Sequence, residues 1–157
     1  ITLDASGNAA AGDQSTENKT AEPSTLDELF GGENLSVTYT GAEIAANYME
    51  GGYYSLDAEQ GKTFVIVGID ITNSGADEIA IDNFAKTPKF SVMVNGQEKA
   101  EEENTILPSD FALYQETVPA GVTENTILLF QVPDSVTSVD SLDLFVNISG
   151  TNYQITL

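Results

Sequence analysis

The most regular hydrophobic pattern in the chain lies in residues 62–75, KTFVIVGIDITNSG. Alternate positions of this stretch carry β-branched side chains, namely Val65, Val67, Ile69 and Ile71. A period of two residues is typical of a β-strand. The positions between them are mostly apolar up to Asp70, which indicates a central strand packed on both faces. The sequence Asn73-Ser74-Gly75 then supplies the turn chemistry that ends the strand.

Shorter alternating runs continue from residue 33 to the last residue. We expect further strands in the ranges 35–49 (less regular after Gly41), 78–82, 89–94, 97–100, 106–118, 122–132, 142–148 and 153–157. Asn95-Gly96 is a strong hairpin signal between two of them. Roughly seven to nine short strands with turns every ~8–12 residues predict an all-β fold, an immunoglobulin-like antiparallel β-sandwich or small barrel. Its expected core adds Leu128, Phe130, Leu144 and Val146 to the four residues of the central strand.

The first 23 residues differ in composition from the rest of the chain. They are rich in small, polar and acidic side chains and show no hydrophobic period beyond a short ITL sequence. Such a segment has too little apolar surface to offset the entropy cost of ordering. We therefore expect a low-complexity linker or tether in residues 1–23 and a sandwich domain in residues 24–157. Thr25 and Glu28 have capping-box spacing, which predicts one short helix before Gly31-Gly32.

The charge of the chain limits its partners. It has 25 acidic residues and five basic ones, all lysine, for a formal net charge of -20. Nucleic acids and anionic membrane surfaces attract basic proteins, so we expect neither as a partner. A polycationic partner or a cation-rich wall stays open, beside the simpler interpretation that the charge keeps the protein soluble.

Besides Arg, the chain lacks Cys, His and Trp. Without Cys there is no thiolate metal site, thiol nucleophile or disulfide framework. Without His, the Ser-His-Asp and Cys-His catalytic arrangements are excluded within this chain. We therefore expect no transition metal and no organic cofactor, since a glycine-rich phosphate loop is also absent. No apolar run approaches the ~18 residues that a transmembrane helix needs.

One combination of strands and turns resembles a known family. It comprises the strand GKTFVIVGIDITNSG, then Phe84, the Asn95-Gly96 hairpin, the sequence VPAG at 118–121 and the strand LLFQVP at 128–133. This combination, within residues 33–157, resembles an uncharacterised family of immunoglobulin-like domains in Gram-positive surface lipoproteins, structurally akin to a secreted mycobacterial immunoprotective antigen. The resemblance implies an exported protein on the outer face of a Gram-positive cell membrane, anchored through a lipidated cysteine upstream of residue 1. It implies no catalytic residues.

A group of large side chains is the strongest candidate for a binding site. Tyr48, Met49, Tyr53 and Tyr54 surround a bend that contains Gly51-Gly52. Tyrosines on loops suit recognition because they combine apolar area with a polar tip. The alternative is that Tyr53 and Tyr54 point to opposite faces, one into the core and one over the sheet edge.

Acidic pairs are weaker candidates for a cation site. Asp57 with Glu59, and Asp77 with Glu78 near Asp82, could supply oxygen ligands to a hard cation such as Ca²⁺. Neither pair has the spacing of a calcium loop, and solvated loop carboxylates are the simpler interpretation. Two carboxylates can also hydrolyse glycosides, but chance pairs are expected among so many acidic residues.

Three functions remain open on the sequence. The first is a non-enzymatic, extracytoplasmic binding module on a lipoprotein, with a protein or cell-wall component as its partner. The second is a structural spacer or accessory domain without a ligand of its own. The third is a carboxylate- or metal-dependent hydrolase, which the missing residue types make the weakest of the three.

Overall fold

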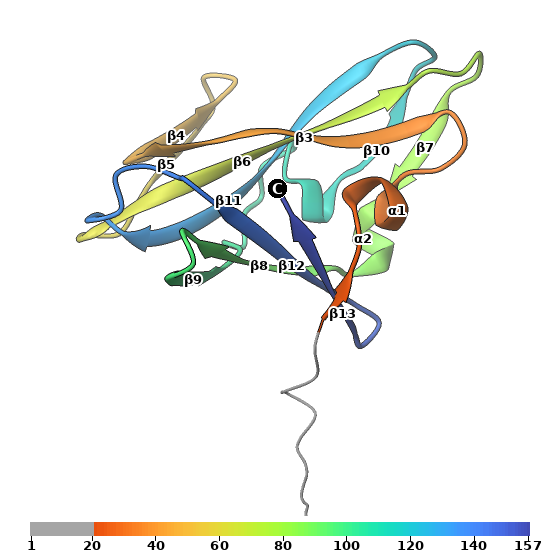
Figure 1. Ribbon diagram of the computed structural model, residues 1–157. Coiled ribbons are helices and arrows are strands. Elements are labelled where there is room, and N and C mark those ends of the chain that lie inside the picture. Colours follow the sequence, from red (N-terminus) through yellow and green to blue (C-terminus); the bar gives the residue numbers. More distant parts are fainter. Residues whose placement is uncertain (1–20) are drawn as a thin grey trace, which may run out of the picture.

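The computed structural model describes residues 21–157, in which two β-sheets pack face to face (Figure 1). The first sheet has the strand order β11-β6-β3, formed by β3 (Leu35–Ala45), β6 (Lys62–Asn73) and β11 (Thr123–Pro133). The second has the order β2-β13-β12-β8-β9, formed by β2 (Glu22–Pro23), β8 (Lys89–Val94), β9 (Glu98–Glu101), β12 (Leu142–Ile148) and β13 (Thr151–Thr156). This arrangement confirms the predicted antiparallel β-sandwich.

The strand β6 lies at the centre of the first sheet, with β3 and β11 antiparallel on either side. Val65, Val67, Ile69 and Ile71 are at most 1% exposed and face the second sheet. Phe64 and Ile66 are buried on the opposite face. The prediction of a central strand packed on both faces is therefore confirmed.

The second sheet supplies the other half of the core. Its inward-facing side chains include Val92, Leu144 and Val146, which meet Leu128 and Phe130 of β11 in one buried cluster. All eight core residues expected from the sequence are buried. The turn between β8 and β9 places Asn95 and Gly96 at positive φ angles of 54° and 70°, as their sequence predicts for a hairpin.

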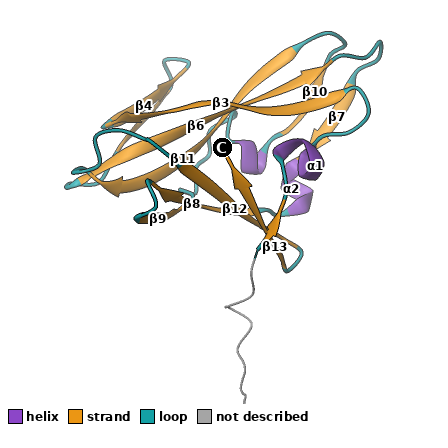
Figure 2. Cartoon of the chain, in the orientation of Figure 1, coloured by secondary structure: helices purple, strands orange, loops and turns teal. Residues whose placement is uncertain are grey.

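Short helices and a second pair of strands close one end of the sandwich (Figure 2). These elements are α1 (Leu26–Phe30), β7 (Ile79–Asp82), α2 (Asn83–Lys86), the 3₁₀ helix η2 (Phe111–Leu113) and β10 (Gln115–Val118), which pairs with β7. α1 begins with the predicted capping box of Thr25 and Glu28. Its Phe30 ring packs edge-on against Phe111 at 4.9 Å between centroids.

A hairpin covers part of the outer face of the first sheet. It consists of β4 (Asn47–Glu50) and β5 (Tyr54–Asp57), joined through Gly51 and Gly52, which both have positive φ. Under it, Phe64, Ile66, Leu107 and Leu129 form a second buried cluster. Tyr48, Tyr54 and Leu56 of the hairpin pack against this cluster. The hairpin therefore has an apolar core of its own, separate from the core between the sheets.

The range 106–118 is not one strand, contrary to the sequence prediction. Only Gln115–Val118 is a strand; Ile106 is 84% exposed, and Phe111 lies in η2. The segment before η2 crosses the edge of β11, where Ser109 accepts one backbone hydrogen bond from Ile127. Its apolar side chains follow no period of two residues, because Ile106 is exposed, Leu107 packs under the hairpin and Phe111 enters the core between the sheets.

The tether prediction concerns residues 1–23, most of which lie outside the described residues. Within the described part, Glu22 and Pro23 form β2, which pairs parallel with Tyr153 and Gln154 of β13. Within the described residues the first strand begins at Glu22, just before the expected boundary at residue 24. No helix among residues 21–157 is long and apolar enough to cross a membrane.

Candidate functional site

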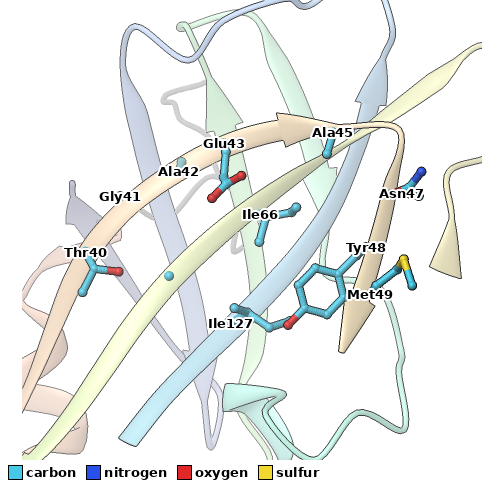
Figure 3. Close-up of a pocket in the computed structure, with 11 residues that line it drawn as sticks. Thr40, Gly41, Ala42, Glu43, Ala45, Asn47, Tyr48, Met49, Ile66 and Ile127 are labelled. Carbon is cyan, nitrogen blue, oxygen red and sulfur yellow. The ribbon is translucent and has the colours of Figure 1, made fainter. Parts of the chain in front are cut away.

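A groove of about 460 Å³ lies between the β4–β5 hairpin and the outer face of the first sheet (Figure 3). Its lining comes from three parts of the chain that are distant in sequence: the consecutive strands β3 and β4, the middle of β6, and the middle of β11. The lining residues are Thr40, Gly41, Ala42, Glu43, Ala45, Asn47, Tyr48, Met49, Ile66, Gly68 and Ile127. Tyr48 extends from β4 toward Ile66 and Ile127 on the floor (Figure 3).

The groove lies over a row of the sheet in which two neighbouring strands carry glycine. Gly68 of β6 pairs with Gly41 of β3 on one side and with Ile127 of β11 on the other. A bulge between Tyr39 and Gly41 sets this register, and Gly41 has a φ of 140° that favours glycine. A Cβ on Gly68 would collide with the side chain of Thr40. A Cβ on Gly41 would meet no atom within 4 Å, so the groove is open over Gly41, while the Thr40 side chain occupies the space at Gly68.

Hydrogen bonds hold one wall of the groove. The Tyr48 hydroxyl donates to Glu50 Oε1 at 2.9 Å, and the Ser109 hydroxyl donates to the same oxygen. Desolvation by burial raises the pKa of Tyr48 above its usual value, so the hydroxyl stays protonated at neutral pH. These contacts join the hairpin to the segment before η2 and fix the position of Tyr48.

The structure separates the four predicted binding residues into two groups. Tyr48 and Met49 line the groove, and Met49 is 65% exposed. Tyr54 packs half-buried against the second apolar cluster, and Tyr53 points to solvent with 91% of its surface exposed. The groove thus brings together two of the four. The residues on the floor of the groove were not predicted from the sequence. The one feature that could have indicated them is Gly68, because glycine inside a strand often marks a bulge or a close approach of another group.

The acidic candidates lie apart from the groove. Asp57 ends β5, and Glu59 follows in the next loop with its backbone N–H donating to Gln131. Asp77 and Glu78 are exposed in the loop before β7, while Asp82 caps α2 by accepting from the Ala85 N–H. Within residues 21–157, no three acidic side chains are arranged to hold a metal ion.

One carboxyl pair is buried instead of solvated. Glu102 and Asp110 lie within hydrogen-bonding reach beside the edge of β11. Asp110 also accepts from the Thr105 hydroxyl at 2.6 Å and from the Ala112 N–H at 3.0 Å. Neither carboxyl lines the groove, so this pair has no contact with a ligand bound there.

The sandwich is shared with proteins of known structure. No family model matches the sequence, and neither does any curated protein. An uncharacterised β-sandwich protein from Clostridium difficile is similar over 92% of this chain and 99% of that chain, with a TM-score of 0.51 and 17% identity. At this identity the likeness concerns the fold.

Two further structures are less similar. A candidate lipoprotein from Bacillus subtilis matches 88% of this chain and 39% of that chain, with a TM-score of 0.44 and 12% identity. A conserved hypothetical protein from Bacillus anthracis matches 77% of this chain and 87% of that chain, with a TM-score of 0.42 and 10% identity.

Proposed function

We propose that the chain is a non-enzymatic, extracytoplasmic binding module that holds part of a partner molecule in the groove beneath β4. The observation that carries this proposal is the groove itself: an exposed thioether and a half-buried phenol stand over an apolar floor beside a row of glycines. Concave sites with apolar linings and few polar groups are typical of ligand-binding sites.

The lining of the groove favours binding over catalysis. It contains one carboxylate, that of Glu43, and the Tyr48 phenol, whose pKa burial raises. A general acid and a general base held within reach of one substrate atom would need a second titratable group near neutral pH. None of the residues in the lining supplies one.

Charge narrows the class of ligand. Glu43 is the one charged residue in the lining, and Glu50 stands behind Tyr48. With a formal net charge of -20, the protein repels anionic polymers and attracts neutral or cationic molecules. A secreted protein or a neutral to cationic component of a cell wall fits these requirements.

The extracytoplasmic part of the proposal rests on the sequence. The strand and turn motifs between residues 61 and 133 resemble those of immunoglobulin-like domains in Gram-positive surface lipoproteins. Such domains are held at the membrane by a lipid on an upstream cysteine. A composition like that of residues 1–23 suits the tether that this arrangement needs.

The test uses variants that change the groove and leave the sandwich intact. Backbone amide NMR spectra of the protein are recorded during titration with soluble peptidoglycan fragments and with purified secreted proteins. Saturable shifts at groove residues, weakened by Met49→Ala and by Asn47→Ala at two exposed positions of the lining, would support the proposal. Tyr53→Ala is the matched control, since this exposed tyrosine lies on the same hairpin outside the groove lining.

Two results would contradict the proposal. If melting temperatures stay constant and both groove variants bind as the unchanged protein does, the groove is not the site. Absence of any saturable shift at the groove would favour a spacer domain without a ligand of its own.

A further inference from the structure

A second pocket of about 290 Å³ opens at the edge of β11, beyond the end of the hairpin. Its lining comes from β4, the segment before η2, β10 and the first half of β11. Its polar lining residues are Glu50, Ser109, Tyr114, Glu116, Thr117, Glu124 and Asn125. No pattern in the sequence brings these positions together.

The charge in this pocket is uncompensated. Three glutamates line it, and no lysine does. Glu50 is held in place by the hydroxyls of Tyr48 and Ser109, which both donate to its Oε1 atom and leave Oε2 free of these contacts. A cation bound in the pocket would be attracted by these carboxylates without competition from a lysine in the lining.

Tyr114 supplies an independent indication of a ligand. The residue is only 7% exposed, and its ring belongs to the core between the sheets. Its hydroxyl makes no hydrogen bond to any side chain or backbone atom of residues 21–157, and because it is not among the buried unpaired atoms, it is open to the pocket that the residue lines. A phenol hydroxyl that reaches a pocket without a protein partner can accept from, or donate to, a ligand there.

The carboxylates near Tyr114 come from two strands. Burial, followed by the charges of Glu124 and Glu116, raises the pKa of the Tyr114 hydroxyl above its ordinary value. The Tyr114 hydroxyl and the carboxylates of Glu116 and Glu124 therefore belong to the same pocket. On the β11 edge, Ile127 donates its N–H outward to Ser109. Asn125, two residues earlier, must direct its backbone carbonyl to the same edge, because direction alternates along a strand.

We propose that this pocket binds the primary ammonium group of a lysine side chain on a partner polypeptide. An ammonium has three donors, and the carboxylates of Glu116 and Glu124 and the Tyr114 hydroxyl are acceptors in the pocket lining. The Asn125 carbonyl on the β11 edge gives a polypeptide partner a further point of attachment. This pocket shares no lining residue with the groove, so the proposal does not depend on whether the groove binds a ligand.

The geometry favours an ammonium over other cations. A guanidinium is a flat fork that pairs best with a single carboxylate in bidentate fashion, whereas an ammonium is compact and suits acceptors from several directions. A metal ion needs several oxygens that converge on one point. The described residues hold no group of three acidic side chains arranged for that purpose.

The test is a titration with Nα-acetyl-lysine methylamide at low ionic strength, followed by backbone amide NMR. We expect saturable shifts at Tyr114, Glu116, Glu124 and Asn125. The double variant Glu116→Gln/Glu124→Gln should weaken binding about tenfold or more, and Tyr114→Phe by a few-fold. Tyr114→Phe removes the hydroxyl and keeps the ring in the core. The melting temperature of this variant shows whether core packing has changed, independently of the binding measurement.

The matched control is Glu33→Gln/Glu101→Gln, which makes the same change in net charge at exposed positions outside this pocket. It should bind as the unchanged protein does. An equal loss in both double variants would overturn the proposal, because the attraction would then depend on net charge alone. Equal binding of Nα-acetyl-arginine methylamide or Nα-acetyl-norleucine methylamide, or no saturable shift with the lysine compound, would also overturn it.

Discussion

Glu102 and Asp110 place two carboxyl groups within hydrogen-bonding reach of each other at the point where the chain crosses the edge of β11. The backbone N–H of Glu102 donates to Phe90, and its Oε2 atom is buried without a partner among the described residues. Burial, the hydrogen bond to Asp110 and the charges of Asp110 and Glu103 raise the pKa of Glu102 to about 9. The pair therefore holds one proton at neutral pH.

The stability of the protein should depend on this proton. In the unfolded chain Glu102 ionises near the ordinary glutamate pKa of 4.5, whereas in the folded protein its pKa is about 9. The folded state binds more protons between these values, so the stabilisation from protonated Glu102 is complete below 4.5 and lost as the pH rises toward 9. Urea unfolding at a series of pH values measures this loss.

Glu102→Gln isolates that effect from the other carboxylates. The amide stays neutral and keeps a donor for Asp110, so the variant should gain stability relative to the unchanged protein as the pH rises. A constant difference between the two proteins from pH 5 to about 9 would contradict the raised pKa.

Asn73 should be important for stability although it is polar. Its side chain is fully buried, and its amide group donates to the backbone carbonyls of Asp77 and Val118 at 2.8 and 3.0 Å. Asn73→Ala removes both donors and should cost about 2–4 kcal/mol, because both carbonyls lose their partner. Asn104→Ala, at an exposed position, should change stability by less than about 0.5 kcal/mol. Chemical denaturation distinguishes the two.

The core between the sheets should tolerate truncation poorly. Val67 and Phe130 are completely buried, and deletion of buried side-chain atoms leaves a cavity. Val67→Ala should destabilise the fold by ~2 kcal/mol and Phe130→Ala by ~3–5 kcal/mol. Thr38→Ala, on the exposed face of β3, is the control. If both core variants unfolded at the urea concentration of the unchanged protein, the core assignment would be wrong.

Two truncations test where the stable domain begins. A chain that starts at Ala21 should keep the unfolding midpoint of the whole chain, since the composition of the first 20 residues offers little apolar surface. A chain that starts at Leu26 loses β2, the Ser24 N–H bond to Gln154 and the Thr25 cap. It should be less stable by about 1–3 kcal/mol. A large loss in the first truncation would contradict the tether prediction.

The sheets were predictable from sequence because their strands are long and regular. In β6, β11 and β12 one set of alternate positions is apolar and faces the core, so a period of two residues identifies both the strand and its buried side. The segment before η2 has no such period. Leu107 packs under the hairpin, Phe111 enters the main core and Ile106 points to solvent, so its apolar residues belong to different environments.

The candidate sites were less predictable for a different reason. The sequence placed Tyr48, Met49, Tyr53 and Tyr54 near one bend, which is a local property, and two of them line the groove. Gly41 and Gly68 meet the hairpin only through the register of β3 against β6. The second pocket depends in the same way on Tyr114, Glu116 and Glu124, which come together only through tertiary packing.

A strand that is buried on both faces also limits how far the sequence can diverge. Every position of β6 from Thr63 to Val67 is buried, so polar substitutions there would be removed by selection for folding. The exposed positions of β3 and of the β4–β5 hairpin are not restricted in this way. A sandwich of this kind therefore keeps an apolar central strand while the exposed residues of its hairpin are free to change.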